Sequence, residues 1–187
     1  RRGDVARLLC YDEYISLRNE NGDNYEIGEQ IKFDSQGNLY VGLINVTSNY
    51  VGGEIYRYSS PDSRVLVAGG NGDGTALNQI RATTGFRFEF DKNQEFLYIK
   101  DGQTFYNKDD WDPMRILKWR IGSSSGNFIA QMTTANMDNQ REESLGGYSN
   151  LVLDDNDNIY FSSSHNIYRI KSQTTQIEKI ISHQDIW

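Results

Sequence analysis

Side chains with catalytic or metal-binding chemistry are few in this sequence. It has two histidines, His165 and His183, and one cysteine, Cys10. Structural zinc sites need several cysteine or histidine ligands, and a nucleophilic cysteine needs a base beside it, which Cys10 in its apolar segment lacks. The carboxylates, 26 in all, are too numerous for one catalytic pair to stand out. We therefore expect no nucleophile elbow, no catalytic residue, no cofactor and no metal site.

One segment combines aromatic rings with carboxylates, and it is the best candidate for partner binding. Aromatic side chains are enriched at contact sites, and carboxylates accept hydrogen bonds from sugar hydroxyls or basic groups. The alternative is a loop that folds its rings against its own sheet. The predicted partner-binding residues are Phe105, Tyr106, Asp109, Asp110, Trp111 and Asp112.

Two short motifs suggest modification or ion binding. Asn45-Val46-Thr47 is a sequon for N-glycosylation, which would be used only in a secreted protein, so we predict an extracellular or secreted location. Residues 154–158 carry oxygen-containing side chains at their first, third and fifth positions, as the start of a calcium-binding loop does. However, Ile159 stands where that loop needs glycine, and His165 where it needs glutamate. We therefore expect a solvated hairpin turn there.

Charge and hydropathy argue against two classes of partner. Lysine and arginine total 19 against 26 acidic residues, a net charge of −7, so the chain lacks the positive charge that phosphate binding uses. Nucleic acid is therefore not an expected partner. The mean hydropathy is −0.68, and no stretch approaches the 18 apolar residues of a membrane span.

A hairpin-like unit occurs three times along the chain. Its copies begin at Asp34, Asp91 and Asp154, and each has a polar turn followed by an apolar run that contains a tyrosine. Four strands per unit, repeated, are typical of the blades of a β-propeller. Two further apolar segments follow each copy: residues 54–58 and 65–68, residues 115–119 and 128–131, and residues 166–170 and 177–181.

The repeated unit resembles the NHL repeat. Gly37-Asn38 and Tyr40-Val41 match the family pattern in the first copy, and residues 98–101 with Arg115-Ile116 match it in the second. Ser163 departs from it, because the family has aspartate after the second strand. The resemblance implies an all-β, NHL-like β-propeller of four-stranded antiparallel blades. Some NHL-type propellers are metal-dependent lyases with several channel histidines, which two histidines cannot supply.

The chain holds about three and a half blades. We assign a partial blade (third and fourth strands) to residues 1–29, blades to 30–70, 84–133 and 149–182, and the start of another to 183–187. Propellers close with about 4–8 blades, because each blade covers its faces with two neighbours. We therefore expect a fragment of a longer chain, with a second subunit that supplies the missing blades as the alternative.

Long connections are predicted at one end of this propeller, at residues 44–53, 69–85, 102–113 and 134–147. Insertions confined to one face often mark the binding face of a repeat protein, although neutral variation in loops is the alternative. We predict a non-catalytic module that binds protein or glycan partners through this long-loop face. The alternative is a self-assembling structural subunit of a glycosylated extracellular fibre or matrix. A propeller lyase or lactonase ranks third, because no catalytic constellation supports it.

Overall fold

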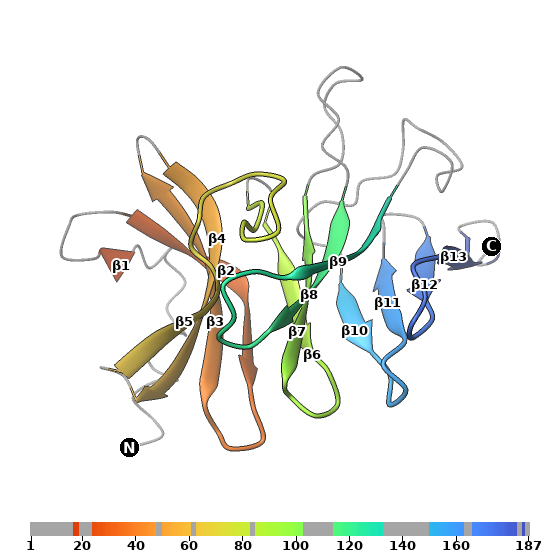
Figure 1. Cartoon of the computed structure of the whole chain (residues 1–187), viewed down its shortest axis with the longest axis horizontal. Helices are drawn as coiled ribbons and strands as arrows, with labels where there is room; N and C mark the ends of the chain where they lie inside the picture. Colours follow the sequence, from red (N-terminus) through yellow and green to blue (C-terminus); the bar gives the residue numbers. More distant parts are fainter. Residues whose placement is uncertain are drawn as a thin grey trace.

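The chain is all-β in the part that the structure describes. The computed structural model describes residues 17–18, 24–47, 50–60, 63–82, 85–102, 114–132, 150–162, 166–182 and 185. These residues form strands, turns and connections but no α-helix (Figure 1). Consequently, none of them belongs to a helix that is long and apolar enough to cross a membrane.

The first sheet is an antiparallel meander in which each strand pairs with the next one along the chain. The predicted four strands are β2 to β5, and the two-residue strand β1 adds a fifth at the edge. Its strands are β1 (Leu17–Arg18), β2 (Asn24–Phe33), β3 (Leu39–Thr47), β4 (Tyr50–Ser60) and β5 (Ser63–Gly69).

The second and third sheets repeat this meander with four strands each. The second sheet contains β6 (Arg87–Phe90), β7 (Phe96–Asp101), β8 (Arg115–Arg120) and β9 (Asn127–Gln131). The third contains β10 (Leu151–Leu153), β11 (Ile159–Ser162), β12 (Ile167–Ile170) and β13 (Ile177–Ile181). The prediction of repeated four-stranded antiparallel sheets is therefore confirmed.

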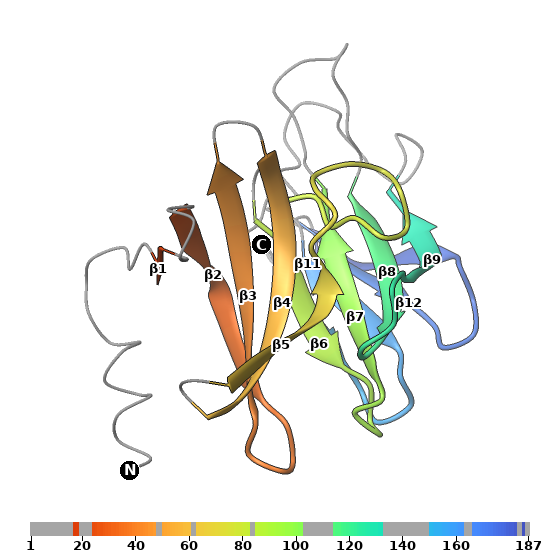
Figure 2. The same ribbon diagram turned by 60° about the vertical axis from the view of Figure 1, so that its left-hand side comes forward.

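The three sheets follow one another across the molecule, with the second sheet in the middle (Figures 1 and 2). Side chains alternate between the two faces of a strand, and β7 shows how both faces of the second sheet become buried. Leu97 and Ile99 belong to a core cluster shared with the first sheet. Tyr98, between them, belongs to a cluster shared with the third sheet. The sheets thus pack through their faces, and each interface has its own hydrophobic core.

Each sheet therefore has a forward face, toward the sheet that follows in sequence, and a rear face, toward the sheet that precedes. The tyrosine of the repeat lies on the forward face and pairs with a basic residue of the next strand in all three sheets. The pairs are Tyr40 with Arg57, Tyr98 with Lys118, and Tyr160 with Arg169. Tyr40 and Tyr98 are only 3% and 6% exposed, whereas Tyr160, on the last sheet, is half-buried.

The aspartate of each repeat stabilises the turn that it begins. Asp34 Oδ1 accepts a hydrogen bond from the backbone nitrogen of Asn38 at 2.8 Å, and Asp154 Oδ1 accepts one from that of Asn158 at 2.9 Å. Asp91 Oδ1 accepts two backbone bonds in the same way. The bond from the Asn158 side chain, with further bonds from the turn, lowers the pKa of Asp154. The Asp154 carboxylate thus serves its own turn, as the hairpin interpretation of residues 154–158 predicts.

Two predicted boundaries differ from the structure. Residues 44–53 were expected to form a long loop, but β3 extends to Thr47 and β4 begins at Tyr50, so most of this segment is a β-hairpin. The physical reason is that backbone pairing continues well past the apolar residues, through Asn45 and Gly52. The predicted border between residues 29 and 30 also falls inside β2.

Candidate functional site

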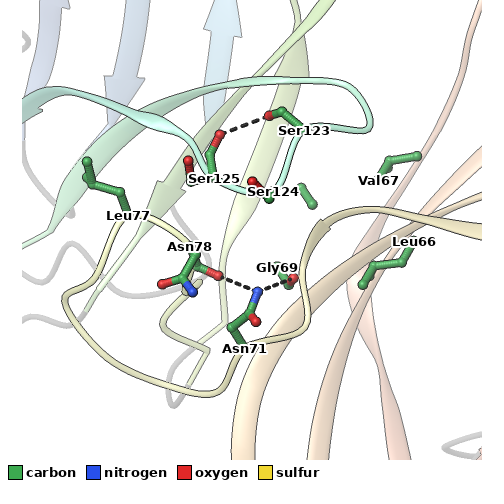
Figure 3. A pocket seen from close by; sticks show the side chains of 10 residues that line it. Leu66, Val67, Gly69, Asn71, Leu77, Asn78, Ser123, Ser124 and Ser125 are labelled. Carbon is green, nitrogen blue, oxygen red and sulfur yellow. Dashed lines mark hydrogen bonds between the residues drawn. The ribbon is translucent and has the colours of Figure 1, made fainter.

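An open groove of about 490 Å³ lies where the first sheet meets the second (Figure 3). One wall is the end of β5 with the connection that follows it, and the other is the turn between β8 and β9. We call it the rim groove. Its lining residues are Leu66, Val67, Ala68, Gly69, Asn71, Leu77, Asn78, Ser123, Ser124 and Ser125.

The two walls are held together by backbone hydrogen bonds. The Gly122 nitrogen donates to the Val67 oxygen at 3.2 Å, and the Gly126 nitrogen donates to the Leu77 oxygen at 2.8 Å. Each bond joins the β8–β9 turn to the neighbouring segment of the first sheet or its connection. The groove therefore has a fixed width that does not depend on side-chain contacts alone.

The connection that forms one wall is folded on itself by amide side chains. Asn71 Nδ2 donates to the oxygens of Gly69 and Asn78, at 3.1 and 3.0 Å (Figure 3). Gln79 Nε2 donates in turn to the Asn71 oxygen at 2.9 Å. Because these bonds close the connection into a compact loop, Leu77 and Asn78 are presented at a defined place beside β5.

A buried ion pair anchors the same connection to the second sheet. Arg115 of β8 binds both carboxylate oxygens of Asp101 of β7, at 2.8 and 2.9 Å, and both residues are at most 3% exposed. The Arg115 guanidinium also donates to the Gln79 oxygen at 2.8 Å, and Asp101 accepts from the Arg81 backbone nitrogen at 2.9 Å. The Arg115–Asp101 pair therefore has a structural role: Arg115 donates to the backbone of the connection, and Asp101 accepts a hydrogen bond from it.

The chemistry of the rim groove is uncharged. The described side chains that line it are three serines, two asparagines and several aliphatic groups, and none of these described residues is acidic or basic. Leu66 and Leu77 are 40% and 43% exposed, which leaves apolar surface beside the hydroxyl and amide groups. Such a surface can hydrogen-bond a neutral polar molecule and cover its less polar face, as binding sites for small ligands do.

The groove also contains a pattern that the sequence analysis overlooked. Residues 122–126 read Gly-Ser-Ser-Ser-Gly and fit the spacing of a nucleophile elbow, so the expectation that no such pattern exists was wrong. A nucleophile elbow joins a strand to a helix, whereas this turn joins β8 to β9. Ser124 has the nucleophile position of this spacing, and the Oγ of its neighbour Ser123 donates within the turn, where the Arg120 and Ser125 oxygens lie 2.8 and 2.9 Å away. Among the described residues that line the groove, none is a histidine or a carboxylate that could act as base.

A second open groove, of about 480 Å³, lies at the C-terminal ends of β2, β6 and β10, the first strand of each repeat, where the polar turns begin. Charged groups of both signs line it, and Lys32 Nζ and Glu89 Oε2 form an ion pair at 2.7 Å. The carboxylates of Asp91 and Asp154 bind their own turns, as described above. No group of three or more histidine, cysteine or acidic side chains that could hold a metal ion occurs among the described residues.

The predicted partner-binding residues Phe105, Tyr106, Asp109, Asp110, Trp111 and Asp112 lie outside the residues that the structure describes, as do Cys10, His165 and His183. Asn45 is described: it lies in β3, is 8% exposed, and its Nδ2 donates to Glu54 Oε1 at 3.3 Å. Glycosylation of Asn45 stays a prediction.

Sequence reasoning did not find the rim groove because its walls are about fifty residues apart along the chain. Residues 69–85 were predicted to be one of the long connections, and nothing in the sequence placed residues 122–126 beside them. The serine run was visible in the sequence, but its neighbours across the sheet interface were not.

Comparison with known proteins adds no assignment to this geometry. Neither a scan against protein-family models nor searches of curated proteins and of solved structures found a match to the chain. The functional interpretation therefore depends on the sheets, their connections and the grooves between them.

Proposed function

We propose that this chain is an NHL-like β-propeller segment that acts as a non-catalytic binding module for a protein or glycan partner. The supporting observation is the rim groove, an open and uncharged site whose two walls come from neighbouring sheets and are joined by backbone hydrogen bonds. A rigid scaffold that holds short connecting segments in place is how repeat proteins commonly present binding surfaces.

The propeller assignment is supported by the way in which the sheets repeat. The second sheet buries both of its faces, and equivalent tyrosines lie on the forward faces of all three sheets. A propeller blade covers its faces in this manner against the blades on either side. The resemblance of the repeated unit to the NHL pattern points the same way.

A neutral glycan or an uncharged polar peptide segment fits the rim groove best. Serine hydroxyls and asparagine amides can exchange hydrogen bonds with sugar hydroxyls or with peptide groups. The exposed parts of Leu66 and Leu77 can cover the apolar face of a sugar ring or an aliphatic side chain. A strongly charged partner is not favoured, because the lining offers no opposite charge.

The experiment is a binding screen of the 187-residue chain against neutral oligosaccharides and uncharged peptides, with affinities then measured by calorimetry. The variant Ser124→Glu places a charge at the exposed tip of the β8–β9 turn. We expect it to weaken binding at least about tenfold, because a ligand in the groove would cover this charge without pairing it, and burying an unpaired charge costs more than 1.4 kcal/mol. Thr175→Glu, an exposed position in the turn between β12 and β13, is the matched control and should bind as the wild type does.

Two results would reject parts of this proposal. If Ser124→Glu binds with unchanged affinity, the rim groove is not the site, and Trp111→Ala then tests the predicted loop instead. If no neutral ligand binds at all, the assignment as a neutral-ligand module fails. The alternative function, a subunit of an extracellular fibre, predicts that light scattering increases with protein concentration in the absence of any ligand.

A further inference from the structure

Apolar side chains are exposed on the two outermost sheet faces. On the forward face of the third sheet, Val152 is 50% exposed and Ile180 is 38% exposed. On the rear face of the first sheet, Ile31 and Phe33 of β2 are 42% and 60% exposed. Leu39, Val41 and Leu43 of β3 are already buried on this rear face, so its open part is the margin along β2.

The interface between the first and second sheets shows what such faces bind. The ring of Tyr40, on the forward face, meets the edge of Phe90 with ring centroids 4.8 Å apart. Beside it, Lys32 of β2 forms the 2.7 Å ion pair with Glu89 of β6. The Gln30 amide also bonds the backbone nitrogen and oxygen of Phe88, at 2.7 and 2.8 Å. Most of these side-chain links join β2 to β6. The exposed margin on the rear face of the first sheet also runs along β2.

The two outermost faces carry the same positions of the repeat. Phe33 directly precedes Asp34, as Phe90 precedes Asp91, so Phe33 occupies the place that receives a tyrosine ring. Tyr160 is the equivalent of Tyr40 and stands half-buried on the third sheet. Val152 lies two residues before its aspartate, as Lys32 and Glu89 do. The forward face of the third sheet thus carries the tyrosine of the repeat, and the rear face of the first sheet carries the phenylalanine that packs on such a tyrosine inside the chain.

We propose that two copies of this chain associate head to tail, with the forward face of the third sheet of each copy packed on the open margin along β2, on the rear face of the first sheet of the other. This inference rests on the propeller assignment made above. The described residues of one chain form three sheets, so those of two chains form six, which lies within the range of about 4–8 at which propellers close. A head-to-tail contact that closes on itself produces a discrete assembly, not an open filament.

A second copy is the occupant that the structure supports, because the contact would repeat, between two chains, an interface already formed inside each chain. In that contact Tyr160 meets Phe33 of the second copy, as Tyr40 meets Phe90.

Sedimentation velocity on the 187-residue chain tests this assembly. We expect a single species with twice the chain mass of 21.5 kDa over the micromolar range. A species with the mass of one chain throughout that range would overturn the proposal. So would a mass that keeps growing with concentration, because it would indicate an open filament.

Variants at Val152 test the contact from the forward face of the third sheet. Val152→Lys places a charge in the apolar surface that the contact buries, so we expect the dissociation constant to rise at least about tenfold. Val152→Ile keeps an apolar side chain at this position and should remain dimeric. If both variants dissociate equally, or neither does, Val152 is not buried in the contact and the proposed arrangement is wrong.

Phe33→Asp tests the opposite face and should also dissociate the pair. Its matched control is Phe128→Asp on β9 of the middle sheet, where the side chain is 49% exposed but lies on neither outermost face. Val65→Lys, 52% exposed on β5, serves in the same way for Val152→Lys. Both controls should keep the mass of two chains, and their dissociation would contradict the proposal. A monomeric result leaves the rim-groove experiment unaffected, because Ser124 lies on neither outermost face.

Discussion

Lys100 is a lysine in the interior of the second sheet, where it lies opposite Arg87 of β6 and Ile116 of β8 and is 2% exposed. Burial, together with the nearby Arg87 charge, lowers the pKa of Lys100 to about 7. Its sequence context, an apolar strand of the repeat, did not indicate this. The position corresponds to Gly42 in the first sheet and Ser162 in the third, so the repeat does not require a charge there.

This shift makes the free energy of unfolding depend on pH. The folded-state pKa of Lys100 is about 7 and the unfolded value is about 10.4, so between these values the unfolded chain binds a proton that the folded chain does not. Stability contributed by this site therefore rises with pH across that window, by at most about 1.4 kcal/mol per pH unit. Below pH 7 the cost of the buried charge is present in full.

Lys100→Met should flatten that dependence between pH 7 and pH 10 and stabilise the protein at pH 6. Lys100→Arg keeps a charge at every pH and should be less stable than the wild type at pH 9. Urea unfolding followed by circular dichroism at several pH values gives both comparisons. A methionine variant with the same pH slope as the wild type would show that Lys100 does not cause it.

At the scale of elements, the repeat was sufficient to predict four strands per unit and the equivalent places of Tyr40, Tyr98 and Tyr160. It did so because alternation and turn residues act locally, within each hairpin. The length of the β3–β4 hairpin was not predictable in this way, since pairing continues through polar and glycine residues. The rim groove was not predictable either, because backbone bonds between distant segments create it.

Gly69, at the end of β5, illustrates such a long-range constraint. It has φ of +81°, and a Cβ atom there would overlap the carbonyl oxygen of Gly53 in β4. Gly37 has φ of +83°, but nothing lies within 4 Å of a Cβ placed on it. The two glycines therefore share the backbone preference and differ in available space.

Gly69→Ala should consequently destabilise the chain more than Gly37→Ala does. We expect about 1–2 kcal/mol for Gly37→Ala from the left-handed backbone alone, and a further ~1–3 kcal/mol for Gly69→Ala from the overlap. Chemical denaturation of both variants measures the difference. Equal losses would mean that the junction of β5 with the groove connection is looser than described.

At the scale of the whole molecule, three similar sheets pack face to face, and each interface has its own hydrophobic core. The sequence repeat indicated that such sheets exist, and the interleaving of their faces explains why apolar runs of the middle sheet are buried on both sides. Closure of the proposed propeller into a ring depends on more than one interface between sheets. The repeat could not determine it, because closure depends on the outermost faces and on what covers them.

A double-mutant cycle between Tyr40 and Phe90 tests this face-to-face packing most directly. Tyr40→Leu, Phe90→Leu and the double variant are compared by urea unfolding, with Tyr40→Leu and Phe128→Leu as a control pair that should be additive. Because the two rings meet edge to face at 4.8 Å, we predict a coupling free energy of about 0.5–1.5 kcal/mol. Additive losses for Tyr40 and Phe90 would contradict the packing of the first sheet on the second.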